Sequence, residues 1–549
     1  MVIEMKLKFK NKHIKNQMVL TAGLWTYMIW LLMRIPLSRV IGDAGMGLVA
    51  PAFELFWLVA LFTSYSMSRA MAGSIRYRVK REQYRNAGKV FKAAFVINLI
   101  VSVVLALLFV LLARVMADIL FLESLSRMAL LAVAPVIIFS ALIGTFRGYF
   151  SGYGLGVLVA HSQYLEKITM VVCTLICGNI FYSYGEKVTV LLKADNYVYA
   201  YGALGVMTGV LLSQMITILY LLVIYVIYSG TLKGKIGQDN SRKMETQYSL
   251  QRLLLNNSVP LALIAIMANI LILIDQRMFN YCMNKSDMGQ VRTALWGSYY
   301  SKFAVLIGVG ATFVCLSIHS LTGKIYNAYE KEEYRVMREW IGKAVRRICI
   351  TAFPIAIYMA VLSEAVVKCF YKGMTNETVV WVQKGAVLIL LYGFSFLFGQ
   401  LLYKLHMVRE LLITTVISLV IHVLAAYLMI QKAMMGADGV VYSLILFFLS
   451  ETVLGFLLVS RNLKYRQEWI TDVAFPAAAA CVSGLVVLLL NKLLFGSVGA
   501  AITIVIGCLA GVFLYIMLLM VLKVIGEAEL SRMPFGFFFL MLGRNMGIL

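Results

Sequence analysis

Long apolar segments alternate with short polar stretches from one end of the chain to the other. Each has about 20 residues or more, the length that an α-helix needs to cross the hydrocarbon core of a bilayer. The pattern predicts fourteen membrane-spanning helices, and the loops between them are too short for a folded domain outside the membrane. The predicted helices cover residues 17–41, 46–72, 89–113, 128–147, 157–182, 198–228, 253–281, 290–320, 346–371, 379–404, 410–431, 437–460, 470–491 and 497–524.

The composition agrees with this pattern. The chain has 549 residues, of which 61% are hydrophobic and 14% charged, and its mean hydropathy is +0.86. These values predict an all-α polytopic membrane protein. The eight cysteines lie in or beside apolar segments without paired-ligand spacing, so the sequence supports neither a disulfide framework nor a metal site.

The net charge of +24 comes from basic residues in the short stretches between apolar segments. Residues 6–15, 76–92, 229–252 and 324–347 hold five, seven, five and seven Lys or Arg, and the loops of opposite parity hold fewer. Because cytoplasmic loops are enriched in Lys and Arg, both termini are predicted to face the cytoplasm. The basic residues then serve as contacts to anionic lipid headgroups, and no nucleic-acid partner is expected.

An internal repeat is visible in two of these basic loops. Residues 81–85 read Arg-Glu-Gln-Tyr-Arg and are followed by Gly-Lys at 88–89, while residues 331–335 read Lys-Glu-Glu-Tyr-Arg and are followed by Gly-Lys at 342–343. Six predicted helices separate the copies, so both have the same orientation in the membrane. The repeat predicts two pseudo-symmetric six-helix lobes with a pathway between them, and two additional C-terminal helices.

The resulting domain boundaries are an N-terminal lobe at 1–228, a cytoplasmic linker at 229–252, a C-terminal lobe at 253–460, and two helices with a cytoplasmic tail at 461–549.

Charged residues inside the apolar segments are the candidate functional residues. Arg34 lies two-thirds of the way through the first segment, and a guanidinium at that depth costs roughly 2.5–3.5 kcal/mol on insertion scales. A helix keeps such a residue when it faces protein or a cavity, so we expect Arg34 to face a cavity. The alternative is that its long side chain reaches the headgroups, although Arg39 is better placed to do so.

The other interior charges divide into two groups. Basic groups suit a phosphate or pyrophosphate, so the substrate-binding candidates are Arg34, Arg69, Lys302, Arg39 and Arg147. Arg69 lies close to a predicted cytoplasmic end and is equally explained as an anchor. The acidic candidates, for coupling to an ion or for pairing helices, are Asp275, Glu54, Glu166 and Glu364.

Four stretches together resemble a known superfamily. Residues 34–42 read RIPLSRVIG, 45–47 read GMG, 146–150 read FRGYF and 162–166 read SQYLE. This set resembles the multidrug/oligosaccharidyl-lipid/polysaccharide exporter superfamily, and within it the branch of stage V sporulation protein B-like proteins and lipid II flippases. The Gly-Pro that this branch tends to carry in the second helix is replaced here by SYSM at 64–67, so the resemblance does not identify the glycan.

The resemblance implies a fourteen-helix fold of two lobes in a bacterial cytoplasmic membrane, with the last two helices forming a groove for a lipid tail. It implies alternating access that moves an undecaprenyl-pyrophosphate-linked sugar from the inner to the outer leaflet. The central cationic residues of the family carry over to Arg34, Arg69 and Lys302.

Three functions are therefore considered. The first is a monomeric flippase for a lipid-linked glycan, without a cofactor other than a coupling Na⁺ or H⁺. The second is a cation-coupled drug or metabolite antiporter of the same superfamily, for which an acidic or apolar cavity is expected. The third is an integral-membrane glycosyltransferase or polymerase, which needs acidic residues on a sizeable outer loop, whereas 42–45 and 371–377 are short. We expect a transporter and not an enzyme.

Overall fold

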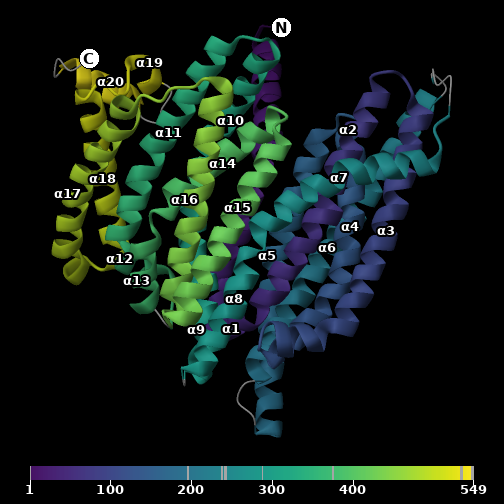
Figure 1. The fold of residues 1–549 in the computed structure, drawn as a ribbon, viewed down its shortest axis with the longest axis horizontal. Helices are drawn as coiled ribbons and strands as arrows, with labels where there is room; N and C mark the ends of the chain where they lie inside the picture. Colours follow the sequence, from purple (N-terminus) through teal and green to yellow (C-terminus); the bar gives the residue numbers. More distant parts are fainter. Residues whose placement is uncertain are drawn as a thin grey trace. The chain divides into compact units, whose positions relative to one another are not determined.

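The computed structural model describes residues 2–193, 197–236, 239, 244–286, 288–373, 376–531 and 536–545, and these ranges contain helices and no strands (Figure 1). The helices are α1 Val2–Ala60, α2 Met67–Val79, α3 Tyr84–Val115, α4 Arg127–Gly152, α5 Gly156–Leu192, α6 Tyr197–Ile236, α7 Gln247–Asn269, α8 Leu271–Lys285, α9 Gly289–Ser298, α10 Ala304–Glu330, α11 Tyr334–Val361, α12 Ser363–Phe370, α13 Asn376–Gly385, α14 Leu388–Lys404, α15 Val408–Ala426, α16 Gly436–Leu463, α17 Phe475–Val498, α18 Ala500–Val521, α19 Glu527–Leu530 and α20 Gly536–Asn545.

The predicted class, an all-α polytopic membrane protein, is confirmed. Twelve helical segments in the described ranges are long and apolar enough to cross a membrane, and a bent pair formed by α13 and α14 raises the number to thirteen. The first of these segments, Thr21–Val79, contains the second predicted helix, 46–72, and all but the first four residues of the first, 17–41. The difference from the predicted fourteen therefore arises mainly because this segment is counted once.

The chain reverses direction within α1 at Gly42. This residue has φ 71° and ψ 174°, a backbone conformation that glycine adopts without strain. The rings of Trp30 and Trp57 stack with their centroids 6.1 Å apart, although 27 residues of straight helix would separate them by about 40 Å. The segment is therefore a helical hairpin whose first arm precedes Gly42 and whose second arm follows it.

The chain divides into two compact units, residues 1–301 and 302–549. The first unit includes α7, α8 and α9, which the repeat assigns to the second lobe. They belong to the first unit because α7 packs on α2 and α3, and α9 packs on α1. The lobe boundaries themselves, with the linker at 229–252, stay a prediction.

The two copies of the sequence repeat form the same turn. In the first copy α2 ends at Val79, Glu82 has φ 57°, and the Gln83 N–H donates to the Arg78 carbonyl at 3.0 Å. In the second, Glu332 has φ 59° and the Glu333 N–H donates to the Ala328 carbonyl at 2.9 Å. Both are Schellman-type helix ends. The repeated charged sequence therefore encodes a repeated helix–turn–helix junction.

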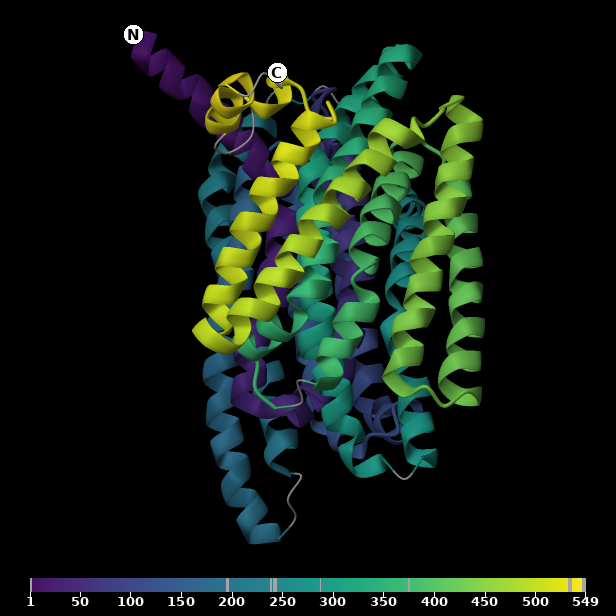
Figure 2. The same cartoon turned by 90° about the vertical axis from the view of Figure 1, so that its left-hand side faces the viewer.

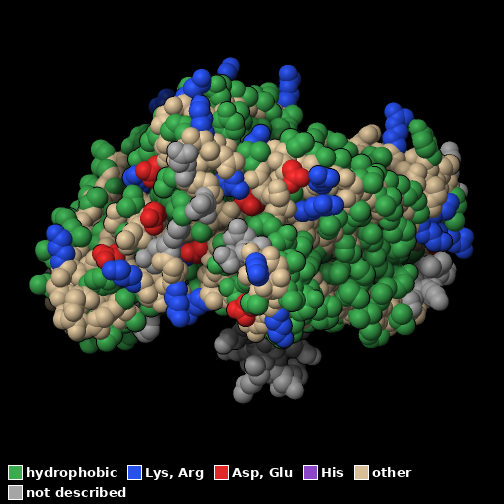
Figure 3. Space-filling view, turned by 90° about the horizontal axis from the view of Figure 1, so that it is seen from below, with side chains coloured by type: hydrophobic (Ala, Val, Ile, Leu, Met, Phe, Trp, Pro, Cys, Tyr) green, Lys and Arg blue, Asp and Glu red, His purple; other side chains and the backbone are tan. Residues whose placement is uncertain are grey.

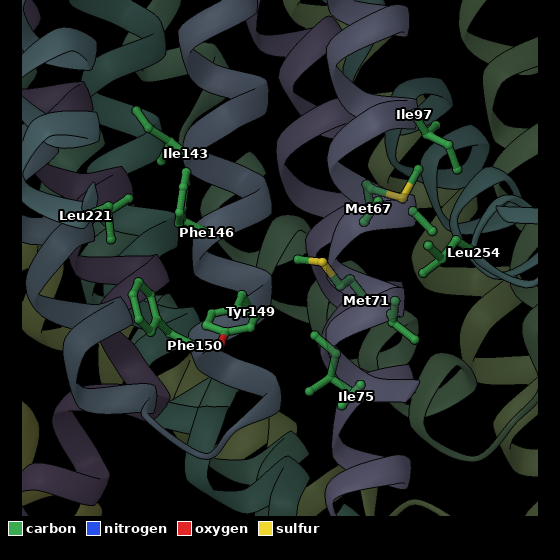
Figure 4. Packing of buried hydrophobic residues seen from close by; sticks show 14 of the residues in the cluster. Met67, Met71, Ile75, Ile97, Ile143, Phe146, Tyr149, Phe150, Leu221 and Leu254 are labelled. Carbon is green, nitrogen blue, oxygen red and sulfur yellow. The ribbon is translucent and has the colours of Figure 1, made fainter. Parts of the chain in front are cut away.

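One hydrophobic cluster of the first unit joins α2, α3, α4, α6 and α7. Figure 4 shows Met67, Met71 and Ile75 in a row along α2, where their spacing of four residues places them on one face. Phe146 and Tyr149 of α4 belong to the same cluster. The FRGYF stretch thus contributes its aromatic rings to helix packing.

The helices α5 and α6 show how the exterior is matched to lipid. Four aliphatic residues of α5 at a spacing of four are each more than half exposed, namely Ile168, Val172, Ile176 and Ile180. Figure 3 shows a broad continuous area of hydrophobic side chains on the face seen from below, with charged side chains in scattered groups. Apolar exposure on this scale is typical of a surface that faces lipid tails.

The helix α9 approaches the hairpin of α1 so closely that two glycines are required. A Cβ atom on Gly297 would lie 1.7 Å from the carbonyl oxygen of Asp43, and one on Gly47 would lie 2.0 Å from the carbonyl oxygen of Thr293. Small residues allow helix backbones to approach each other in membranes. These glycines therefore set the distance between α1 and α9.

We predict that Gly297→Ala destabilises the protein by about 1–3 kcal/mol because the added methyl group forces α9 away from α1. Gly23→Ala is the matched control, since nothing lies within 4 Å of a Cβ atom there. Thermal unfolding of the purified protein in detergent measures both. Equal unfolding temperatures for the two variants would contradict the close packing of α1 and α9.

Candidate functional site

Arg34 lies in the first arm of the α1 hairpin, with a side chain that is 2% exposed. Its guanidinium lies between the rings of Trp30 and Tyr300, 3.8 Å from each ring centroid. Its Nη1 donates to the backbone carbonyl of Tyr300 at 3.2 Å. Two alternatives were predicted from the sequence, namely that Arg34 faces a cavity or that its side chain reaches the headgroups. The structure shows neither arrangement. The side chain is enclosed by protein.

Glu54, in the second arm of the same hairpin, is the counter-ion of Arg34. Its Oε1 accepts a hydrogen bond from Arg34 Nη2 at 3.3 Å and another from the Tyr300 hydroxyl at 2.6 Å. Buried charges in proteins are normally paired and hydrogen-bonded, and Arg34 and Glu54 are both. The sequence predicted that Glu54 couples to an ion or pairs helices. In the structure it forms an ion pair between the two arms of α1.

The guanidinium keeps hydrogen-bonding capacity. Arg34 Nε is buried and has no acceptor among the described residues, and the contact of Nη2 with Glu54 is a single long one. An Arg–carboxylate pair is commonly bidentate and shorter. Glu54 therefore uses only part of the hydrogen-bonding capacity of the buried Arg34 guanidinium.

Local sequence explains how these groups come together. Trp30 and Arg34 are four residues apart on α1 and so share one helix face. Tyr300 lies in a π-helical turn, Tyr299–Phe303, that follows α9. Such turns carry one extra residue and often occur at functional sites, because they redirect side chains.

Lys302, in the second unit, is fully buried. Its Nζ donates to the backbone carbonyl of Lys372 at 2.8 Å. An ammonium group completely enclosed by protein is expensive unless its donors are bonded. Lys302 is thus a second buried cation, held within its own unit.

A second ion cluster, centred on the buried Glu166, joins α4, α5 and α6. Arg147 Nη2 lies 2.7 Å from Glu166 Oε2, and its Nε donates to the Ser162 hydroxyl at 2.9 Å. Glu166 Oε1 accepts from Lys167 Nζ at 2.9 Å and from Gln214 Nε2 at 3.1 Å. Arg147 and Glu166 therefore hold these three helices together.

The remaining candidates lie outside these clusters. Arg39 and Arg69 are exposed, and Arg69 donates to the hydroxyl of Tyr65 at 2.7 Å. Glu364 forms an exposed ion pair with Lys368 at 2.6 Å, a kind of pair that contributes little to stability. Asp275 is buried in α8. The contacts of Arg34 described above are with Trp30, Glu54 and Tyr300, and the roles of these four other residues stay predictions.

Sequence reasoning did not identify Trp30 and Tyr300, although both touch the guanidinium. The position of Trp30 one helical turn before a buried arginine was an available signal, since aromatic faces attract guanidinium groups. Tyr300 comes from a distant helix, and nothing in the spacing pointed to it. In the part of the chain that the structure describes, no group of three His, Cys, Asp or Glu side chains could hold a metal ion.

The sequence profile of a family described as polysaccharide biosynthesis protein matches residues 15–314, which is more than half of the chain and includes the whole Arg34 cluster. The chain belongs to this family. Among curated proteins, this family member is 21% identical to stage V sporulation protein B of Bacillus subtilis (strain 168) over 527 residues, covering 96% of this chain and 98% of that protein.

Two solved structures show the fold of this family member. The lipid II flippase MurJ in an inward closed conformation has a TM-score of 0.63 at 12% identity, over 90% of this chain and 96% of that chain. A multidrug resistance MATE family transporter of the MOP superfamily in an inward-facing conformation has a TM-score of 0.60 at 14% identity, over 80% of this chain and 94% of that chain. These likenesses confirm the predicted fold, which this family member shares with the flippase and with a transporter of the MOP superfamily.

We predict that Glu54→Gln costs about 3–5 kcal/mol of stability, because it leaves Arg34 charged and buried without a counter-ion. The double variant Arg34→Met, Glu54→Leu is expected to cost less than Glu54→Gln alone, because no buried charge remains. Thermal unfolding in detergent of both variants, with Arg34→Met and Glu54→Leu alone completing the cycle, measures the coupling. Strictly additive effects of the single substitutions would show that the two charges do not interact.

Proposed function

We propose that the protein is a flippase that moves a polyprenyl-pyrophosphate-linked sugar across the bacterial cytoplasmic membrane by alternating access. The observation that carries this proposal is the buried, partly occupied guanidinium of Arg34. A planar guanidinium with free donors suits a phosphate group. In this proposal the protein acts as a monomer with both termini in the cytoplasm.

Family membership and the stage V sporulation protein B relative support a glycan-related substrate. The fold does not discriminate, since the TM-scores to the flippase and to the multidrug transporter are 0.63 and 0.60. Function is determined by the site and not by the fold. The choice therefore depends on the charge of the groups that meet the substrate, and a buried guanidinium favours an anion.

In the proposed mechanism, Glu54 holds Arg34 while no substrate is bound. A pyrophosphate carries more negative charge than one carboxylate and offers several acceptors, so it competes for the donors of Arg34, including Nε. Lys302 is proposed as a second phosphate contact. The carboxylate of Glu54, once released, is the proposed site for a coupling H⁺ or Na⁺.

A cation-coupled antiporter is the second candidate function. The observation in its favour is that the Arg34 cluster also contains a buried carboxylate, Glu54, which a cationic substrate or ion could contact if Arg34 moved away. The likeness to the multidrug transporter is compatible with this alternative.

We predict that Arg34→Ala abolishes translocation of a labelled polyprenyl-pyrophosphate sugar in proteoliposomes, because the phosphate loses its cation, while membrane insertion stays intact. Arg34→Lys should restore only part of the activity, since an ammonium keeps the charge but not the planar fork. Arg114→Ala, which removes an exposed arginine of α3, is the matched control.

Leaflet transfer is measured by the accessibility of the labelled sugar to an enzyme added outside. Transfer at the unsubstituted rate by Arg34→Ala would overturn the proposed flippase. Proteoliposomes that instead accumulate a cationic dye in response to a Na⁺ or H⁺ gradient, without lipid transfer, would establish the antiporter.

A further inference from the structure

The chain continues beyond its last membrane-spanning helix into a short apolar helix, α20. Residues 536–543 read GFFFLMLG and contain no polar side chain, and Arg544 and Asn545 follow. A helix of this composition at a protein surface in water would expose its aromatic residues unfavourably. Figures 1 and 2 show the C-terminal helices at the end of α18, next to the C label.

The inner face of α20 packs against the membrane-spanning part of α18. The ring of Phe539 lies 5.9 Å from the ring of Phe513, and Phe539 is buried in a cluster with Tyr515 and Leu519. Phe513 precedes the last residue of α18, Val521, by eight residues, or about 12 Å of helix. The helix α20 therefore lies at the end of α18 and packs against its last turns through Phe539.

The outer face of α20 is apolar and uncovered. Phe537 is 81% exposed, Met541 58% and Phe538 53%. In α18, Phe513, whose ring contacts the inner-face Phe539, is itself 43% exposed, and Leu509 one turn before it is 69% exposed. Because α18 is a candidate membrane span, its exposed apolar residues are suited to lipid tails, and the exposed residues of α20 have the same apolar character.

Ion pairs hold the polar ends of the segment. Arg544 Nη2 lies 2.8 Å from Glu527 Oε2, which places the charged end of α20 against α19. Glu529 of α19 pairs with Arg346 of α11. The first pair thus joins α20 to α19, the second joins α19 to α11, and the aromatic residues Phe537 and Phe538 stay exposed.

We propose that α20 is an interfacial helix, whose Phe537, Phe538 and Met541 face contacts membrane lipid at the boundary between acyl chains and headgroups, with Arg544 at headgroup level. Amphipathic helices bind in this layer through their buried apolar area and through attraction of basic residues to anionic lipids. The interaction holds the C-terminal segment at one membrane surface, where Glu529 pairs with Arg346 of α11. This inference is independent of the transported substrate.

The test is hydroxyl-radical footprinting of the full-length protein in nanodiscs that contain one copy each and a mixture of phosphatidylcholine and phosphatidylglycerol. Met541 is compared with Met244, which precedes α7 and is 45% exposed. Although Met541 is the more exposed of the two in the protein alone, we expect lipid to slow its oxidation about fivefold or more relative to Met244.

Two variants complete the test. Phe537→Ser combined with Phe538→Ser should raise the oxidation rate of Met541 toward that of Met244, because α20 loses its contact with lipid. Tyr248→Ser, at an exposed aromatic residue of α7, should leave it unchanged. Equal oxidation of Met541 and Met244 without substitutions would overturn the proposal. So would protection of Met541 only in preparations with two copies per disc, because a second copy would then be the partner.

Discussion

The ion pair between Arg34 and Glu54 is the interaction on which the first unit depends. A guanidinium placed inside a bilayer costs roughly 2.5–3.5 kcal/mol on insertion scales. Two aromatic faces at 3.8 Å, a carboxylate and a backbone carbonyl surround this one. A desolvated cation–π contact contributes about 2 kcal/mol, so two rings and an ion pair are sufficient to offset the cost. The ion pair stabilises the fold only while both rings, the carboxylate and the backbone carbonyl contact the guanidinium.

The pair in turn requires the backbone geometry around it. Arg34 and Glu54 are 20 residues apart and meet because the chain reverses at Gly42, where φ is 71°. Tyr300 reaches the same point because α9 lies against α1, at a distance that only Gly47 and Gly297 permit. Three glycines therefore position a cluster whose chemistry lies in an arginine, a glutamate and two aromatic rings.

Much of the fold could be predicted from sequence, because the membrane imposes a length and an apolar composition on each helix. The repeat was also readable, since its charged residues form the same turn at Glu82 and Glu332. The extent of the first unit was not predictable, because the packing of α7 and α9 depends on side-chain shape. At the site, its depth in a helix identified Arg34 as a candidate. Its contact with Glu54 depends on the helix reversal and its contact with Tyr300 on a π-helical turn, and hydropathy shows neither.

The placement of the interior charges also separates structural from functional roles. Arg147 and Glu166 pair with each other and with three further hydrogen-bonding residues across three helices, so their charges are used within the protein. Arg34 differs because its contact with Glu54 is long and its Nε remains without an acceptor in the described residues. A saturated ion cluster gains little from an external anion, whereas a partly occupied guanidinium gains hydrogen bonds. This difference in saturation, and not burial alone, is the physical reason why we propose a phosphate contact for Arg34 and regard Arg147 as a residue that holds helices together.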